Sequence, residues 1–572
     1  MVPVPRSSQV STGAARSPHR ALSAAAPRAD RGRGTKIPAA RSAEVSAPLI
    51  EGETCWRTAH ADRVALLVDA QAYFAAAEGA LREAERSILL IGWHFDSRTR
   101  LRPFTPDPTP IGHLLIRLAR ERPELKVRVL IWNMALAMSA GFEFYPGRAR
   151  ATFVGTGVSY HLDRTAPFGA SHHQKLLVVD DKIAFIGGGD FSVDRWDTAR
   201  HLDEDPRRMD PDGDFHPPRH EVMAMVDGDA ARLIGDVARE RWCRGTGETL
   251  KPVVTAGDPW PDMMPSSLED VTVAVSRTRA AHHTYSPLRE SEALHLAAIA
   301  SARHTIYLEN QYVTSRVIAE ALAVRLAEPD GPEVTVISTR QSPSWFDRVT
   351  MDRTRDGLIE RLREADVHGR FSAWCPLTPG GGGVIVHSKV SVIDDRLLRV
   401  GSTNLNNRSL GFDTECDLVV QAETDAQRDA VRTLRDRLIG HFLGCTGAAF
   451  SEAVNQFETL EGAIRAMNRR GRLEALKTNA HGPFGKLVAA WQMGDPISRE
   501  DSFRPWRRRR LAEAAGERAR LAVSAAVLKL EVHPQRQVVG GQPHQRGVGG
   551  LDVQHADPPA DEQVVDAQDR QA

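Results

Sequence analysis

Two copies of a histidine–lysine–aspartate motif are the residues in this sequence best suited to chemistry. In each copy the lysine stands two positions after the histidine and the aspartate five positions after the lysine: His173, Lys175 and Asp180, then His387, Lys389 and Asp394. Side chains two positions apart on a strand point to the same face, so each histidine should lie beside its lysine. An imidazole can act as a nucleophile or an acid–base group near neutral pH, and an ammonium group binds anions. The pattern therefore predicts chemistry on a bound anion.

The elements that must position these residues are repeated as well. Residues 171–190 read as a short apolar strand, an Asp-Asp turn, a second strand and a run of three glycines. Residues 386–404 repeat this order, and Asn404 stands where Asp190 stands in the first copy. A long duplication with a repeated polar cluster predicts two lobes that share one site at their seam.

Strands and helices alternate in both halves of the chain. This alternation predicts an α/β fold of two similar lobes, each a mixed β-sheet flanked by helices. At strand ends, Trp93 and the run 309–311 could either border the site or simply pack and start loops. The polar run at 198–218 reads as a surface insertion. The predicted segments are a disordered tail (1–47), a first lobe (48–265), a second lobe (266–448), a helical extension (449–502), and a basic turn with a low-order tail (503–572).

Composition limits the possible functions. The 572 residues carry equal numbers of acidic and basic side chains, which argues against a dedicated nucleic-acid binder. The five cysteines are scattered, which argues against a disulfide framework or a zinc site and favours a reducing, cytoplasmic compartment. No apolar run has the length of a membrane span. We therefore expect a monomer without cofactor or metal that contacts membranes only at their surface.

The two motifs resemble the HKD motifs of the phospholipase D superfamily. Similarity to the branch that includes the eukaryotic enzymes is carried by HHQK at 172–175, GGDF at 188–191, RWDT at 195–198, ENQY at 309–312 and GSTNLNNRS at 401–409. The resemblance covers roughly residues 66–443. It implies a phospholipase D fold, in which two α/β lobes pack face to face. It also implies metal-independent chemistry through a phosphohistidine.

The resemblance also implies roles for individual residues. It favours His173 as the nucleophile and His387 as the acid–base group, an order that the nearly symmetric sequence does not decide. Glu415 matches the acidic partner of His387, and Glu221 occupies the corresponding strand as the candidate partner of His173. A carboxylate near the acid–base histidine should raise its pKa. His172 should point away from the site and act as a packed or hydrogen-bonded neighbour.

The remaining candidates concern phosphate binding and structure. Lysines from both lobes should neutralise the phosphate. Asn404 and Ser402 can donate hydrogen bonds to phosphate oxygens, whereas Asp190 should accept a bond from a neighbouring donor. The resemblance suggests that Asp180 and Asp394 have structural roles at the lobe interface.

The leading hypothesis is a phospholipase D that releases phosphatidic acid from glycerophospholipids, with transphosphatidylation when an alcohol replaces water. A phosphatidyltransferase of the cardiolipin synthase type is a second possibility. A nucleic-acid phosphodiesterase and a non-catalytic, phosphate-binding scaffold are further alternatives. The balanced charge argues against the nuclease, and the intact histidines and lysines argue against the scaffold.

Overall fold

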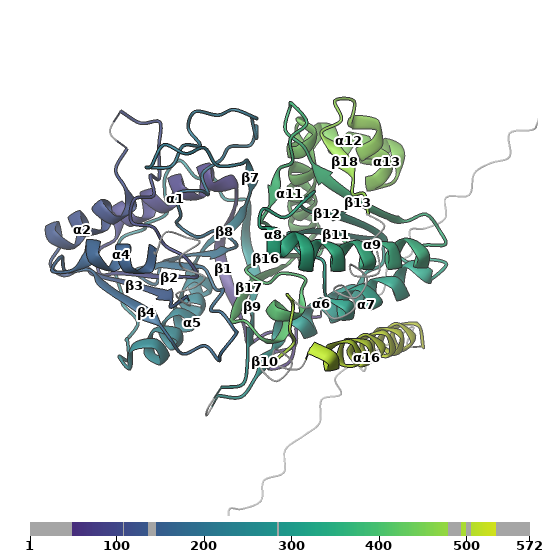
Figure 1. Cartoon of the computed structure of the whole chain (residues 1–572), viewed down its shortest axis with the longest axis horizontal. Coiled ribbons are helices and arrows are strands. Elements are labelled where there is room, and N and C mark those ends of the chain that lie inside the picture. The colour runs from purple at the N-terminus through teal and green to yellow at the C-terminus, as the bar shows by residue number, and fades with distance from the viewer. Residues whose placement is uncertain are drawn as a thin grey trace, which may run out of the picture. The chain divides into compact units, whose positions relative to one another are not determined.

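One continuous β-sheet carries the internal duplication (Figure 1). The computed structural model describes residues 48–106, 108–134, 145–282, 285–478, 494–498 and 505–532. The first half of the sheet has the order β1 (Arg57–Val68), β8 (Val222–Asp227), β6 (Ile183–Gly187), β5 (Leu176–Val179), β2 (Ser87–Gly92), β3 (Lys126–Trp132) and β4 (Ser159–Asp163). The second half repeats it with β9 (Leu268–Arg279), β17 (Glu415–Gln421), β16 (Leu397–Gly401), β15 (Lys389–Ile393), β11 (Thr305–Asn310), β12 (Glu333–Ile337) and β13 (Phe371–Pro376).

The two halves meet in two ways. At the seam, β1 forms antiparallel backbone hydrogen bonds with β9, which join the two halves into one sheet. Strands β6 and β8 also contact β16 and β17, and one apolar core contains Ile186 and Ala224 together with Val400 and Leu418. The predicted fold class, two similar α/β lobes that pack against each other, is confirmed. The predicted boundaries of the segments stay predictions.

Helices flank both halves of the sheet. The first half has α1 (Asp69–Glu83), α2 (Ile111–Glu121), α4 (Tyr145–Phe153) and α5 (Gly228–Thr246). The second has α6 (Glu290–Ser301), α7 (Arg316–Ala327), α8 (Trp345–Asp347), the π-helix η1 (Arg348–Asp352), α9 (Arg353–Ala365), α10 (Asn407–Gly411) and α11 (Asp425–Leu443). Among the described helices, none combines the length and apolarity needed to cross a bilayer.

Local chemistry explains the elements next to the motifs. All four residues of β5 are buried, as the apolar run predicts. The Asp-Asp turn after β5 has φ values of 54° and 52°, and its counterpart after β15 has 52° and 55°. Aspartate tolerates this left-handed conformation better than most residues, and two such residues fit a tight hairpin. Both turns therefore fix the register of the strands that carry the motifs.

The C-terminal part differs from its prediction in two places. Within the helical extension the sequence predicts one helix at 453–469, but the structure has two, α12 (Gly447–Phe457) and α13 (Leu460–Met467), because Glu458 adopts a φ of 61° between them. They are followed by β18 (Leu473–Ala475), which pairs with β13 and was not predicted.

The basic turn predicted from residue 503 onward is wrong where the structure describes it. Residues 505–532 form helix α16 (Pro505–Val532), which packs against α6 and α7. Its residues Ala519, Val523 and Val527 are buried at a four-residue spacing, and the two valines join the core of the second half. The tails predicted at 1–47 and after residue 532 lie outside the described residues.

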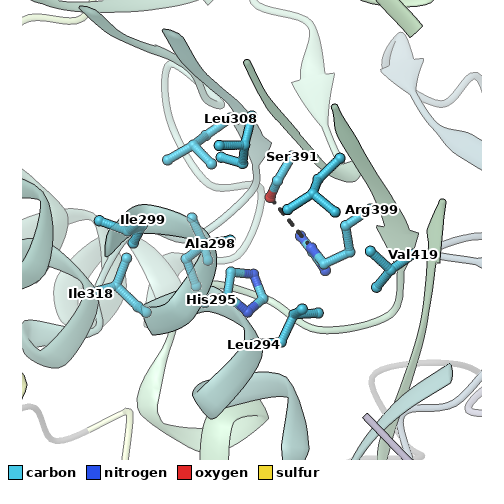
Figure 2. A pocket seen from close by; sticks show the side chains of 12 residues that line it. Leu294, His295, Ala298, Ile299, Leu308, Ile318, Ser391, Arg399 and Val419 are labelled. Atoms are coloured by element: carbon cyan, nitrogen blue, oxygen red, sulfur yellow. Dashed lines mark hydrogen bonds between the residues drawn. The ribbon is translucent and has the colours of Figure 1, made fainter. Parts of the chain in front are cut away.

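A small cavity lies inside the second half (Figure 2). Its volume is about 20 Å³, which is room for one water molecule. His295 of α6 and Arg399 of β16 are the charged or titratable groups among mainly aliphatic lining residues. The Arg399 guanidinium donates to Ser391 Oγ and Asp417 Oδ1, so its charge is balanced within this core.

Candidate active site

Each motif histidine is anchored by backbone pairing with the opposite half. His173 N donates to Thr414 O (2.9 Å), and Thr414 N donates to Ser171 O (2.9 Å). In the equivalent place, β14 (Ile385–Val386) pairs parallel with β7 (Arg219–His220), and His387 N donates to His220 O (2.8 Å). Both partner segments lie immediately before a glutamate. Each histidine is therefore held against the glutamate of the other half.

The side chains of the two histidines also pair with the opposite half. His173 Nδ1 donates to Glu415 Oε2 at 3.0 Å and lies 3.1 Å from Ser402 O, whereas His387 Nδ1 donates to Glu221 Oε2 at 2.6 Å. The predicted pairing of Glu415 with His387 and of Glu221 with His173 is therefore wrong. The prediction assumed that each half completes its own site, but the backbone bridges place each glutamate across the seam. With Nδ1 as the donor, Nε2 keeps the lone pair in each neutral imidazole.

Two buried lysines lie beside the histidines. Lys175 Nζ donates to His173 O (2.7 Å) and lies 3.5 Å from Asp190 Oδ2, and Lys389 Nζ donates to His387 O. Burial lowers the pKa of Lys389 to about 7 and shifts the pKa of Lys175 in the same direction. A bound anion would oppose this shift, because it stabilises the charged form.

The histidines and glutamates also respond to burial. Burial, reinforced by the lysines, lowers the pKa of both motif histidines. Burial raises the pKa of Glu221 to about 7 and that of Glu415 in the same direction. The rise expected for an acid–base histidine beside a carboxylate is therefore not found. Neutral imidazole is favoured, which is the form that a nucleophile needs.

The predicted phosphate ligands fall into two groups. Asp190 Oδ1 accepts hydrogen bonds from the backbone N–H groups of Trp93 (3.0 Å) and His94 (3.1 Å), as expected for an acceptor. Ser402 Oγ donates to Glu415 Oε2 (2.5 Å), so in this structure its only proton goes to the glutamate and not toward a phosphate. Asn404 is buried and lines the cleft next to His173.

The two motif aspartates lie away from this site. Asp180 accepts hydrogen bonds from the backbone N–H groups of residues 85–87, and Asp394 from those of residues 303–305, at 2.6–2.8 Å. Each aspartate stands five positions after its lysine along an extended strand, a distance of roughly 16 Å. Both carboxylates therefore bind the start of a neighbouring strand in their own half. Their structural role fits the contacts, but the predicted position at the lobe interface is wrong.

An open cleft of about 810 Å³ reaches His173 from the surface. Trp93 forms part of its wall, stacks on Trp132 with 5.9 Å between ring centroids, and meets the His173 ring edge-on at 6.3 Å. Of the two interpretations of Trp93, the pocket wall is therefore the one that fits. Further lining residues that the sequence analysis did not identify are Arg164, Phe168, Tyr312, Phe346 and Arg408.

Three other sequence expectations can be compared with the structure. His172 is buried and contacts Asp163, Thr165 and Thr414, so the predicted packed neighbour is confirmed. Glu309, in the run 309–311, contacts a histidine, His220, that does not belong to either motif. Most of the polar run at 198–218 is exposed, as expected of a surface insertion, but His201, Asp205 and Arg208 within it are buried. Sequence alone gives no signal for these partners, since charged residues normally indicate exposure.

Comparisons with known proteins show which proteins the chain resembles. Residues 295–435 match the family model described as "Cardiolipin synthase, PLD-like domain". Phospholipase D A of Dictyostelium discoideum is 25% identical over 436 residues, which cover 63% of this chain and 33% of that protein. Phospholipase D1 of Saccharomyces cerevisiae is 25% identical over 393 residues, which cover 51% and 23%. The chain thus spans a third or less of the length of these two relatives.

Among solved structures, phosphatidylserine synthase of Haemophilus influenzae aligns with 74% of this chain and 92% of its own, at a TM-score of 0.49 and 13% identity. The sequence relatives and the family model agree with the duplicated motif and the two-half sheet. The chain resembles the phospholipase D superfamily, and in particular the branch that includes the eukaryotic enzymes.

Proposed function

We propose that the protein is a phospholipase D that hydrolyses the distal phosphodiester of glycerophospholipids to phosphatidic acid and a free head-group alcohol. The observation that carries the proposal is the exchange of partners across the seam. Each half contributes a histidine whose Nδ1 is held by a carboxylate of the other half, and each contributes a lysine beside it. This arrangement supplies a nucleophile, an acid and two cations for one phosphodiester anion.

In the first step, Nε2 of His173 attacks the phosphorus atom. A phosphorus–nitrogen bond forms while the bond from phosphorus to the head-group oxygen breaks, and His387 gives its Nε2 proton to the leaving oxygen. His387 must be protonated at this point, although burial lowers its pKa in the free site. The charge of a bound phosphodiester would raise that pKa, because an anion stabilises the imidazolium.

In the second step, water replaces the alcohol. His387 accepts a proton from the water while the water oxygen bonds to phosphorus, and the phosphorus–nitrogen bond breaks with its electron pair returning to His173. An alcohol that enters instead of water gives transphosphatidylation by the same path. Lys175, Lys389 and the amide of Asn404 are the proposed ligands of the phosphate oxygens.

The cleft supports a lipid substrate. Its wall combines aromatic side chains with Arg164 and Arg408, so it can contact both an apolar chain and an anionic group. Trp345 and Phe346 stand beside it on α8 with exposed fractions of 72% and 56%. Exposed aromatic side chains at a site entrance are typical of a surface that meets a membrane interface.

The first test is to incubate the full chain with mixed phospholipid vesicles and ethanol. We expect phosphatidic acid and phosphatidylethanol, and we expect His173→Asn to reduce both by at least about 10³-fold. Both products should fall together, because both pass through the same phosphohistidine. His161→Asn, at an exposed position of β4, serves as the control. A His173→Asn variant that is folded and retains either product at the wild-type rate would contradict the proposal.

The name of the matching family model supports a second candidate, a phosphatidyltransferase that uses a lipid alcohol as acceptor. Vesicles of phosphatidylglycerol without ethanol separate the two. Phosphatidic acid as the main product supports the hydrolase, whereas cardiolipin as the main product supports the transferase. Product from DNA and none from lipid would instead indicate a nuclease.

A further inference from the structure

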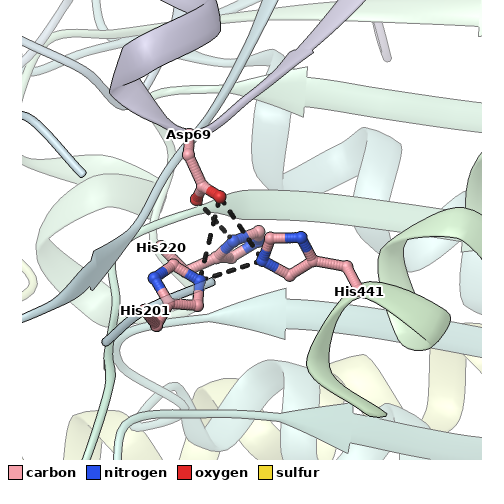
Figure 3. A group of neighbouring side chains, drawn as sticks. All are labelled: Asp69, His201, His220 and His441. Atoms are coloured by element: carbon pink, nitrogen blue, oxygen red, sulfur yellow. Dashed lines mark hydrogen bonds and ion pairs between the residues drawn. The ribbon is translucent and has the colours of Figure 1, made fainter. Parts of the chain in front are cut away.

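Three histidines and an aspartate meet in the interior of the molecule (Figure 3). Asp69 begins α1, His201 belongs to the buried loop after the first motif, His220 belongs to β7, and His441 belongs to α11 of the second half. One possible ligand atom from each lies within 4.8 Å of all the others. The side chains of Asp69 and His220 are 0% exposed, that of His201 is 1% and that of His441 is 7%.

Two of these histidines have their outward nitrogen bound by a buried carboxylate. His201 Nδ1 donates to Asp197 Oδ2 (2.8 Å), and His220 Nε2 donates to Glu309 Oε2 (3.0 Å). In neutral imidazoles these bonds leave the lone pairs of His201 Nε2 and His220 Nδ1 facing the cluster, where His220 Nδ1 lies 3.0 Å from Asp69 Oδ1. Histidine ligands of metal ions are oriented by carboxylates in the same way.

The imidazole nitrogens and the carboxylate oxygen that face the centre lie close together, and neutral histidines supply too few N–H protons to form hydrogen bonds between all of them. His201 Nε2 and His441 Nε2 are 2.9 Å apart, and Asp69 Oδ2 lies 3.4 Å from His441 Nε2 and 3.8 Å from His201 Nε2. Among the described residues, none donates a hydrogen bond to this buried oxygen. An unpaired carboxylate oxygen that faces imidazole lone pairs is costly unless a cation lies between them.

We propose that Asp69, His201, His220 and His441 bind one zinc ion. Zinc accepts nitrogen and oxygen ligands at about 2.0–2.2 Å in a tetrahedron, which places neighbouring ligand atoms about 3.4 Å apart. The three distances between inward atoms, 2.9, 3.4 and 3.8 Å, bracket this value. Imidazole ligands favour zinc over magnesium and calcium, which prefer oxygen.

The local charge agrees with a bound cation. Asp69, Asp197 and Glu309 are three buried carboxylates, and Arg208 Nη1 lies 3.7 Å from Asp197 Oδ2 as a partial counter-charge. These carboxylates give the cluster a negative potential that a zinc ion would offset.

The proposed zinc has four protein ligands and no open position, as in structural sites. It would link α11 of the second half to α1 and β7 of the first. It would also support the catalytic candidates, because Asp69 N donates to Glu221 O (2.7 Å) and His387 N donates to His220 O (2.8 Å). The ion takes no part in the proposed reaction, so this inference is independent of the proposed function.

The test measures metal content in the intact chain, purified without a polyhistidine tag and dialysed against metal-free buffer. Mass spectrometry of the elements should find about one zinc per wild-type chain, as expected for a closed structural site. His201→Gln and His441→Gln should lose the zinc. His295→Gln is the matched control, since His295 is buried in the separate cavity of Figure 2 and should keep the zinc at the wild-type level.

A second measurement covers the case in which the variants do not fold. Wild-type protein produced in cobalt-supplemented medium should show the visible absorption bands of tetrahedral Co²⁺, and zinc should raise the Tm of the metal-depleted wild type. A wild-type chain that contains no transition metal and takes none up from added zinc would overturn the proposal, leaving a proton-linked network. Folded His201→Gln and His441→Gln chains that both retain one zinc would overturn it as well.

Discussion

Two buried glutamates and the histidines that they contact determine which groups of the candidate active site bind protons. Glu221 and Glu415 are fully buried, and each contacts the Nδ1 of a histidine from the opposite half. Burial raises the pKa of both carboxyl groups and lowers the pKa of both imidazoles, so neither member of a pair is readily charged in the free site. Charging these buried groups therefore costs free energy in the free site. An anionic substrate can offset part of that cost, because it stabilises a charged imidazolium.

Replacement of Glu221 by glutamine tests this view through pH. Burial raises the pKa of Glu221 from its ordinary value of 4.5 to about 7 in the folded chain, so the unfolded chain binds fewer protons between these values. Wild-type stability should therefore lose a contribution as pH rises from about 4.5 to 7. Glu221→Gln removes this contribution, so its Tm relative to wild type should rise by a few degrees across that window. Thermal unfolding of both proteins at matched pH values is the measurement.

The same variant should lose activity at every pH. Glutamine keeps the size of the side chain but cannot stabilise the imidazolium of His387, so we expect kcat to fall by about 10²–10⁴-fold with a smaller change in KM. A Tm difference between the two proteins that stays constant from pH 4.5 to 7 would contradict the assigned pKa. Unchanged kcat would contradict the assigned role of Glu221.

The sequence predicted the reacting residues better than their partners. His173, Lys175, His387 and Lys389 were identified because each pair occupies one short strand, and local spacing is visible in a sequence. The partner of His173 lies 242 positions away and is chosen by backbone pairing across the seam. No local pattern encodes that pairing, so the glutamates were recognised but assigned to the wrong histidines.

Among the secondary-structure elements, β6 ends in a close contact with the other half. A Cβ atom at Gly188 would lie 2.5 Å from Glu221 Oε1, 2.9 Å from His387 O and 3.1 Å from Lys389 Cδ. A Cβ atom at the neighbouring Gly189 would meet its nearest atoms at 3.3–3.4 Å. Close approach of the two halves at this point therefore requires glycine at 188 and tolerates a small side chain at 189.

Alanine substitutions at these two glycines form a matched pair. Gly188→Ala should push β6 away from the second motif, lower stability by about 1–3 kcal/mol and reduce kcat by at least about tenfold. Gly189→Ala should have a clearly smaller effect on both quantities. Chemical denaturation and vesicle assays on the two variants provide the comparison. Equal losses of stability and kcat in the two variants would show that the close contact at position 188 does not require glycine.

Strands and helices with a regular apolar pattern were predictable from the sequence, whereas elements whose conformation depends on tertiary packing were not. The strands at 87–92 and 176–179 are found where apolar runs place them. The predicted helix at 453–469 breaks at Glu458, which carries no sequence signal for a positive φ. The basic run 507–510 suggested a turn, yet arginine favours helices and the apolar side of α16 decides the conformation by packing on α7.

At the scale of the whole molecule, the cleft and the aromatic residues at its mouth define a surface for the substrate. Phe168 and Phe346 line the cleft and are 70% and 56% exposed, and Trp345 next to them is 72% exposed. Aromatic rings partition into the interfacial region of a bilayer. This surface would bring the cleft, and the candidate nucleophile within it, to the lipid head groups.

The Trp345→Ala/Phe346→Ala double variant tests this surface. We expect weaker sedimentation with phospholipid vesicles and a higher apparent KM on vesicles, but little change in turnover of a dispersed short-chain phospholipid. The control is Val254→Ala, because Val254 is 92% exposed and is not among the residues that line the cleft. Equal vesicle binding by the double variant and wild type would contradict the idea that this surface contacts the membrane.

The exchange of glutamates across the seam has a consequence for the origin of the chain. If the link between the halves were cut, the repeated strand order and the β1–β9 pairing would describe a symmetric homodimer, in which each subunit completes its partner's histidine. Such an ancestor would lose its active centres on dilution. Fusion of two gene copies makes the encounter intramolecular, at effective concentrations of about millimolar. It also frees the two copies to diverge, one histidine toward attack and the other toward proton transfer.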